Sequence, residues 1–390
     1  MALADGKMLS LDAGAMLQQA AERNGLEPWI DPALAERIDY MVGLLNEFGL
    51  LNETEFDAAV TQIESVIVKR LKVARDWALH SEILEAEIKQ PFFVVGNARA
   101  GTTFAQSILA LDEGHRTPRF RDVQHPSPPR GADAASDAAA LAEQGNYVDF
   151  ILAKSPTMMP AHPYFDQRGE TEAEDEYVYS LDFHLVYPLW LLKTANMPQA
   201  MPPRDPVLAL QFHKNMLKQF QWKCPTRRWV GKGVLHQYLM PSVLEVYPDA
   251  VCFWMHRRPE EYIASLLELL KLQYEPFNGG RYNVKPAEMV AQLKAGVDAI
   301  LASPATNDHR VNHIRFHEFV ANPAKVLAPI YEANGIAFTK AYEDRIAARM
   351  ADPAFRADRY GKFTYSLESF GLDRATLRRE FSEYCDRFEI

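Results

Sequence analysis

The sequence reads PFFVVGNARAGTTF over residues 91–104, and this stretch carries the strongest structural signal in the 390-residue chain. Its apolar run, Phe92–Val95, lies between a proline and a glycine, which is typical of a buried strand in a parallel sheet. The loop Gly96–Thr103 and a helical pattern at Thr103–Leu111 follow directly. In such a unit, backbone N–H groups and the positive end of the helix dipole converge on an anion. The stretch therefore predicts an anion site, with a plain glycine-containing turn as the alternative.

Further along the chain, short apolar runs alternate with helical patterns, which indicates an α/β fold with a parallel sheet. The predicted strands are Arg228–Gly231, Ala250–His256 and Val311–Phe316, and the predicted helices are Ala134–Ala153, Glu174–Thr194, Val207–Trp222, His236–Tyr247, Pro259–Leu272, Pro286–Leu301 and Glu318–Asn334.

The first 90 residues have only helical patterns, at Ala33–Phe48 and Glu53–Leu79, with apolar residues three and four apart. We predict a helical N-terminal extension (1–90) packed on an α/β domain (91–390), the two forming one continuous structural unit.

Composition narrows the class of protein. Hydrophobic residues make up 48% and charged residues 24% of the chain, which is typical of a globular protein. The net charge of −10 argues against a nucleic-acid partner, and three cysteines are too few for a disulfide framework.

The N-terminus lacks the charged-then-apolar order of a signal peptide, and the apolar stretch near Phe183–Leu192 is too short to cross a bilayer. We therefore expect a cytoplasmic protein without a transmembrane segment. His309, His313 and His317 would share one face of a helix, but the predicted strand Val311–Phe316 interrupts that spacing, so we expect no metal site.

The cation of the loop is unusual for a phosphate-binding loop. Nucleoside-triphosphate loops have lysine directly after the second glycine, whereas Thr102 occupies that position here and Arg99 lies within the loop. Such a loop suits a shorter anionic donor, such as a 5′-phosphosulfate, better than the triphosphate of a P-loop kinase.

A second anion site is predicted at the end of the strand Ala250–His256. Arg257 follows the strand, where open α/β sheets bind ligands, and Ser265 lies about two helical turns further on. The alternative is that Arg257 pairs with Glu260 or Glu261 and Ser265 only packs.

These segments together resemble the sulfotransferases that use 3′-phosphoadenosine 5′-phosphosulfate (PAPS), especially the bacterial branch. The resemblance runs in order through the loop Gly96–Thr103, the segment Trp229–Lys232 with His236, the turn His256–Pro259 with Ser265, and the segment Tyr365–Leu372.

The resemblance implies a P-loop-like three-layer fold with a central parallel sheet, and PAPS as the donor. It further implies transfer of a sulfuryl group to a hydroxyl or amine of a small molecule, a lipid or a glycan. The residues implied to hold the 5′-phosphosulfate are Gly96, Arg99, Gly101, Thr102 and Thr103, and those implied to hold the 3′-phosphate are Arg257 and Ser265.

The resemblance also suggests catalytic residues. Asp122 stands where the family often has a glutamate base, and His125 is the second candidate. Arg99 and Lys232 would neutralise charge on the leaving group. Asp122 has the alternative of pairing with Arg119 or Arg121, and Lys232 that of an ion pair with a core carboxylate.

Three questions stay open at the level of sequence. The acidic stretch Glu170–Glu176 either favours a helix N-terminus through its dipole or directs one carboxylate at the acceptor. The loops Gln124–Asp137 and Met197–Asp205 are expected to select the acceptor. The alternative functions are a non-catalytic nucleotide-binding protein and a P-loop-type kinase.

Overall fold

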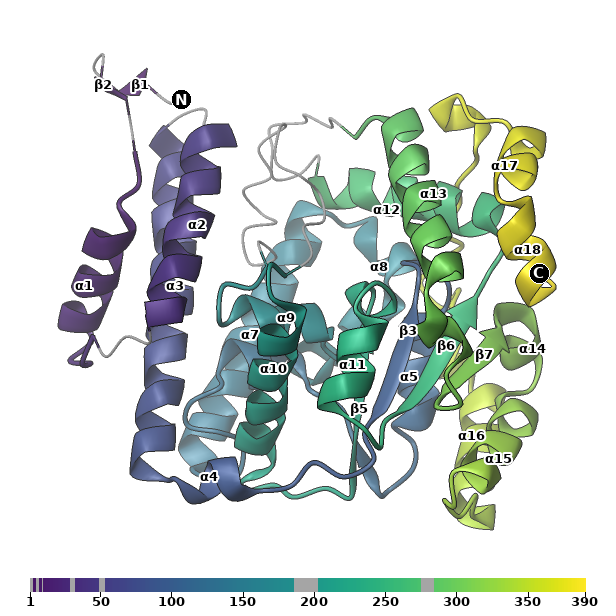
Figure 1. The fold of residues 1–390 in the computed structure, drawn as a ribbon, viewed down its shortest axis with the longest axis horizontal. Coiled ribbons are helices and arrows are strands. Elements are labelled where there is room, and N and C mark those ends of the chain that lie inside the picture. Colours follow the sequence, from purple (N-terminus) through teal and green to yellow (C-terminus); the bar gives the residue numbers. More distant parts are fainter. Residues whose placement is uncertain are drawn as a thin grey trace.

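A five-stranded sheet in which every neighbouring pair is parallel forms the centre of the protein (Figure 1). The strand order is β4-β5-β3-β6-β7, so the strand that precedes the predicted anion loop, β3, is central. The computed structural model describes residues 3–4, 7–8, 10–28, 32–48, 53–185, 203–274 and 284–390. The strands of the sheet are β3 (Phe92–Gly96), β4 (His115–Arg116), β5 (Arg228–Gly233), β6 (Val251–His256) and β7 (Val311–Arg315).

Helices cover both faces of this sheet. On β3, Phe93 and Val95 point into one apolar cluster while Phe92 and Val94 point into another, as the alternation along a strand requires. The two clusters make the three-layer α/β arrangement predicted from the sequence. The first cluster includes side chains of α9 (Asp175–Ser180), α10 (Pro206–Gln221) and α11 (Met240–Val246), and the second includes side chains of α5 (Thr102–Leu109), α15 (Pro323–Ala333) and α16 (Lys340–Ala351).

The N-terminal helices form a layer of their own beside this core, at the left of Figure 1. They are α1 (Ala13–Arg23), α2 (Pro32–Phe48) and α3 (Glu53–Leu79), and they share a separate apolar cluster. Buried ion pairs from Arg37 and Arg70 to Asp182, at 2.5 and 2.6 Å, attach the layer to the core. The division of the chain at residue 90 stays a prediction.

The predicted helix Glu318–Asn334 is wrong in one respect, because it is broken in two at Asn322. The first part is α14 (Phe316–Ala321) and the second is α15. Asn322 precedes a proline, which disfavours helical backbone, and it is extended, with φ −157°. Its side chain instead accepts a hydrogen bond from the Lys325 N–H and caps α15.

Two other predicted helices are also shorter than expected. The segment His236–Tyr247 divides into the 3₁₀ turn η3 (Leu235–Gln237) and α11. In the described part of the segment Glu174–Thr194, residues 174–185, the helix is α9, and the turn after it includes Phe183 with φ 57°. Residues 186–194, and most of the predicted acceptor loop Met197–Asp205, lie outside the described residues.

The other elements include three long helices that the sequence predicts, α7, α12 and α13. They also include short elements, and helices after residue 334, that the sequence analysis does not predict. The remaining elements are β1 (Leu3–Ala4), β2 (Lys7–Met8), α4 (Glu82–Glu85), α6 (Phe120–Gln124), α7 (Ala134–Lys154), α8 (Met158–Ala161), η1 (Pro163–Glu170), α12 (Pro259–Tyr274), α13 (Pro286–Ala302), η4 (Pro304–Asn307), η5 (Pro353–Phe355), η6 (Glu368–Phe370), α17 (Arg374–Glu380) and α18 (Ser382–Phe388).

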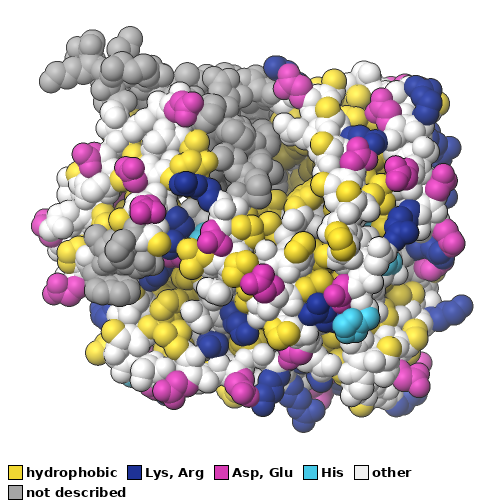
Figure 2. Space-filling view, in the orientation of Figure 1, with side chains coloured by type: hydrophobic (Ala, Val, Ile, Leu, Met, Phe, Trp, Pro, Cys, Tyr) yellow, Lys and Arg dark blue, Asp and Glu magenta, His cyan; other side chains and the backbone are white. Residues whose placement is uncertain are grey.

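The surface carries both signs of charge. Figure 2 shows Lys and Arg side chains interspersed with Asp and Glu over the face that it presents. No helix in the described part of the chain is both long and apolar enough to cross a membrane.

Candidate active site

The loop after β3 has the backbone shape that an anion site needs. Gly96 has φ 142°, and a side chain there would approach the Met255 carbonyl oxygen to 2.6 Å. Gly101 has φ 94° and is the N-cap of α5, where a side chain would overlap the Phe316 ring. Both positions therefore require glycine. The first N–H groups of α5 have no partner within the helix, so they are available to an anion at this loop.

The two predicted anion sites are in direct contact. Arg99 from the loop donates through Nε to the Ser265 hydroxyl at 2.9 Å, and Arg257 donates through Nη1 to the Arg99 carbonyl at 2.9 Å. Arg99 is 166 positions from Ser265 and 158 positions from Arg257 in the chain. The fold brings them together because β3 and β6 are neighbours and their carboxyl ends share one edge of the sheet.

Arg257 is held on several sides. Its Nε donates to Glu261 at 3.0 Å, its Nη2 to the Tyr365 hydroxyl at 3.4 Å, and its guanidinium lies 4.4 Å from the Phe316 ring centroid. The predicted alternative of a pair with Glu261 is therefore present together with the contact to the loop. Tyr365 belongs to the C-terminal segment singled out in the sequence.

Arg99 keeps its charge although it is buried. Burial and the nearby charge of Arg257 lower the pKa of Arg99 to about 10, which leaves the guanidinium protonated at neutral pH. Its guanidinium also lies 5.4 Å from the Phe363 ring centroid. A buried cation held in this way attracts an anionic ligand, because desolvation strengthens the interaction between charges.

Lys232 contacts both the loop and Glu174, a carboxylate whose role the sequence left open. Its ammonium group lies 3.1 Å from the Thr103 hydroxyl and 2.5 Å from Glu174 Oε1. The lysine side chain is almost fully buried at the end of β5, whereas the glutamate is 24% exposed. The predicted alternative, an ion pair between Lys232 and a carboxylate, is thus present, and it places a cation and a carboxylate beside the start of α5.

His162 lies near the same group of charges and was not identified from the sequence. It follows α8, and its Nδ1 is buried without a hydrogen-bond partner. Burial, together with the charges of Lys232 and Arg99, lowers the pKa of His162 to about 3, so the imidazole is neutral. No spacing in the sequence links His162 to the loop.

These contacts define one group of residues at the carboxyl ends of the strands, which we call the strand-end site. It consists of Arg99, Thr103, His162, Glu174, Lys232, Arg257 and Ser265.

Asp122, the base candidate from the sequence, has a local structural role. It lies on the short helix α6, where its Oδ2 accepts a hydrogen bond from the Arg119 N–H at 3.1 Å and lies 3.4 Å from Arg116 Nη2. This is one half of a capping box, in which the carboxylate at the third helical position accepts from the N-cap N–H; the Arg119 guanidinium has no acceptor atom to complete the other half. The predicted alternative, a pair with Arg119 or Arg121, is wrong about the partner. The side chain beside the Asp122 carboxylate is that of Arg116, and the guanidinium groups of Arg119 and Arg121 pair with Glu172 and Glu170.

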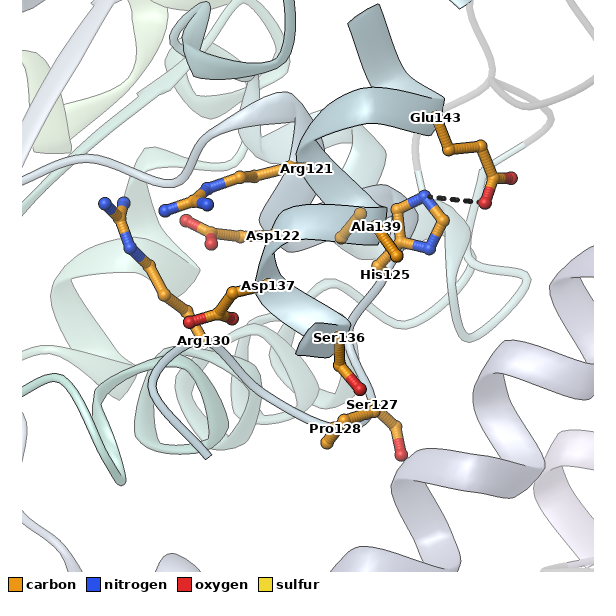
Figure 3. Close-up of a pocket in the computed structure, with 11 residues that line it drawn as sticks. Arg121, Asp122, His125, Ser127, Pro128, Arg130, Ser136, Asp137, Ala139 and Glu143 are labelled. Carbon is orange, nitrogen blue, oxygen red and sulfur yellow. Dashed lines mark ion pairs between the residues drawn. The ribbon is translucent and has the colours of Figure 1, made fainter. Parts of the chain in front are cut away.

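His125 and Asp122 face a cavity of about 190 Å³ between α6 and α7 (Figure 3). His125 Nε2 lies 3.6 Å from Glu143 Oε2, and burial lowers the pKa of His125 below its usual value. Among the described residues, none of the strand-end site lines this α6–α7 cavity. Its lining consists of Arg121, Asp122, His125, Ser127, Pro128, Arg130, Ser136, Asp137, Ala139, Ala140 and Glu143.

Comparison with known proteins identifies the family of the chain. A family model described as "Sulfotransferase family" matches residues 91–340. The crystal structure of sulfotransferase STF9 from Mycobacterium avium is 23% identical with a TM-score of 0.74, and the match covers 100% of this chain and 99% of that one. Sulfotransferase STF1 from Mycobacterium tuberculosis H37Rv is 19% identical with a TM-score of 0.70, over 96% of this chain and 99% of that one. No curated protein sequence matches the chain.

Proposed function

This chain belongs to the sulfotransferase family and is an enzyme of that kind, and we propose that it moves a sulfuryl group from PAPS to a hydroxyl or amine of a small molecule, a lipid or a glycan. PAPS is the donor that the family generally uses. The observation that carries the proposal is the position of Lys232, whose ammonium group contacts both the loop threonine Thr103 and the carboxylate of Glu174.

The donor would be held at its two anionic ends by the two parts of the strand-end site. The loop Gly96–Thr103 offers backbone N–H groups, two threonine hydroxyls and the cation of Arg99 to the 5′-phosphosulfate. Arg257 and Ser265 offer a guanidinium and a hydroxyl to the 3′-phosphate. The direct contact between Arg99 and Ser265 supports this assignment, because one donor molecule must reach both parts.

The transfer itself needs in-line placement, a cation for the leaving group and a base for the acceptor proton. As the acceptor oxygen or nitrogen bonds to sulfur, the bond from sulfur to the bridging oxygen of the donor breaks, and 3′,5′-adenosine bisphosphate leaves with the electron pair. Lys232 and Arg99 neutralise the charge that develops on the leaving group. Glu174 takes the proton of the acceptor.

We assign the base to Glu174 in preference to Asp122 on the basis of their contacts. The Glu174 carboxylate lies against the lysine that contacts the loop, and it is partly exposed, so an acceptor can reach it. The Asp122 carboxylate is occupied by the N-terminus of α6 and by Arg116. Asp122 and His125 stay the second candidates, since they share a cavity large enough for a small group.

Calorimetry with 3′,5′-adenosine bisphosphate, 5′-AMP and ATP with magnesium tests the donor assignment. We expect the bisphosphate to bind, 5′-AMP to bind much more weakly because it lacks the 3′-phosphate, and ATP with magnesium to give no stronger binding than 5′-AMP. Preferential binding of ATP with magnesium would overturn the proposal in favour of a kinase. A screen of phenols, alcohols, amines and glycans with radiolabelled PAPS then identifies the acceptor class.

A further inference from the structure

Three consecutive carboxylates, Glu174–Glu176, connect the start of α9 to the end of β5 and the turn that follows it. Glu174 pairs with Lys232, the fifth residue of β5. Glu176 Oε1 accepts a hydrogen bond from the Leu235 N–H at 2.8 Å. An acidic run that only favoured a helix N-terminus through the dipole would have no need of such partners.

The middle carboxylate, Asp175, lies directly on the backbone of β5. A side chain on Gly231 would overlap its Oδ2 atom, and would also press on the Phe93 ring at 3.0 Å. Asp175 can therefore take its position only because residue 231 has no side chain. Gly231 immediately precedes Lys232, so this contact fixes α9 relative to the strand one residue before the lysine.

Two histidines enclose the same carboxylate from other elements. His213 Nε2 of α10 lies 3.4 Å from Asp175 Oδ1, and His236 Nε2 of η3 lies 3.6 Å from Oδ2. Each histidine is itself held by a tyrosine, since His213 Nδ1 lies 2.7 Å from the Tyr247 hydroxyl and His236 Nε2 lies 2.6 Å from the Tyr179 hydroxyl. Burial lowers the pKa of His236 to about 4, so that ring is neutral at pH 7.

A fully buried carboxylate without a strong hydrogen bond is costly, and stability alone does not account for it. We propose that Asp175 is a positioning residue, which holds the carboxylate of Glu174 against the ammonium group of Lys232. The inference rests on the proposed function, in which Glu174 is the base. Enclosure on three sides removes the freedom of α9 to slide or rotate on β5.

The test uses the full chain and water as the acceptor, by measuring hydrolysis of saturating radiolabelled PAPS to sulfate. We expect Gly231→Ala to slow hydrolysis about 10- to 100-fold, because small displacements of a reacting group cost that much. Affinity for 3′,5′-adenosine bisphosphate should stay within about threefold, since the loop is untouched. Asp175→Asn keeps the size of the side chain and should slow hydrolysis in the same direction, which provides a second variant if Gly231→Ala does not fold.

The decisive measurement is non-additivity with the base. In a Glu174→Gln background, adding Gly231→Ala or Asp175→Asn should change the rate by less than about threefold, because residues that act through one group do not add. Glu172→Gln is the matched control, since it removes a neighbouring buried carboxylate that pairs with Arg119 rather than with β5. It should lower the unfolding temperature and leave hydrolysis nearly unchanged.

The outcomes separate the two levels of inference. Full, multiplicative losses in the double variants, with Glu174→Gln itself slow, would overturn the positioning role and leave the proposed base intact. A normal rate in Glu174→Gln would overturn the base, and with it the positioning role. Equal slowing by Glu172→Gln would show that any loss of a buried carboxylate here slows hydrolysis, which also overturns the specific role of Asp175.

Discussion

The strand-end site and the α6–α7 cavity contain the same kinds of residue but arrange them differently. Each has arginines, at least one carboxylate and a histidine. In the first, Glu174 faces a lysine that contacts the start of α5, whereas in the second, Asp122 accepts a hydrogen bond from the backbone at the start of its own helix. The comparison teaches that the partner a carboxylate faces in the folded protein, and not its neighbours in the sequence, makes it a candidate base.

The largest expected effect compares the two carboxylates directly. Glu174→Gln removes the proton acceptor and should slow sulfuryl transfer about 10²- to 10⁴-fold, which is the usual contribution of a general base. Asp122→Asn should stay within about threefold of the unmodified enzyme. Single-turnover transfer from radiolabelled PAPS measures both rates. A slow Asp122→Asn beside a normal Glu174→Gln would move the base to the α6–α7 cavity.

The next effect concerns donor affinity in the strand-end site. Arg257→Ala removes a charge-assisted contact, worth roughly 1.5–3 kcal/mol, and should weaken binding of 3′,5′-adenosine bisphosphate about 10- to 100-fold. Binding of 5′-AMP should change little. The neighbouring Arg258 is half exposed, and its guanidinium lies 4.0 Å from Glu261, which is long for an ion pair. Arg258→Ala therefore serves as the control. Equal losses for both nucleotides in calorimetry would contradict a 3′-phosphate role for Arg257.

A smaller effect tests whether Asp122 is structural. Asp122→Ala removes the side chain that caps α6 and should lower the free energy of unfolding by about 0.5–2 kcal/mol. His125→Ala, in the same cavity, should cost less, because its partner Glu143 is 75% exposed. Denaturant unfolding of the two variants measures the difference. No loss of stability in Asp122→Ala would show that the cap does not stabilise the fold.

The smallest effect is a pH dependence beside the strand-end site. Burial and the charge of Glu174 raise the pKa of Glu176 to about 8. A raised pKa in the folded state gives stability that is complete below the ordinary value of about 4.5 and is lost as the pH rises through about 8. Glu176→Gln keeps a neutral acceptor for Leu235 and should therefore unfold about 2 °C or more above the unmodified protein at pH 9. Thermal unfolding from pH 5 to pH 9 checks this, and a constant difference across the range would contradict it.

The loop after β3 and the turn at Arg257 could be predicted because their signals are local. An apolar run, two glycines five apart and a helix start lie within twelve residues, and each follows from backbone conformation and burial. The parallel sheet follows from the alternation of strands and helices. The break at Asn322 was also encoded locally, by the proline after it, although the periodicity on both sides concealed it.

The sequence by itself determined the strand β3, the loop after it and the residues that line that loop, because neighbouring residues set the backbone there. The tertiary structure alone decided which carboxylate faces the loop. Glu174 and Lys232 are 58 residues apart, and Arg99 and Ser265 are 166 apart. Arg99 and Ser265 meet because the carboxyl ends of the neighbouring strands β3 and β6 share one edge of the sheet, whereas Glu174 meets Lys232 because α9 packs on β5. No periodicity along the chain records which side chains these arrangements bring together.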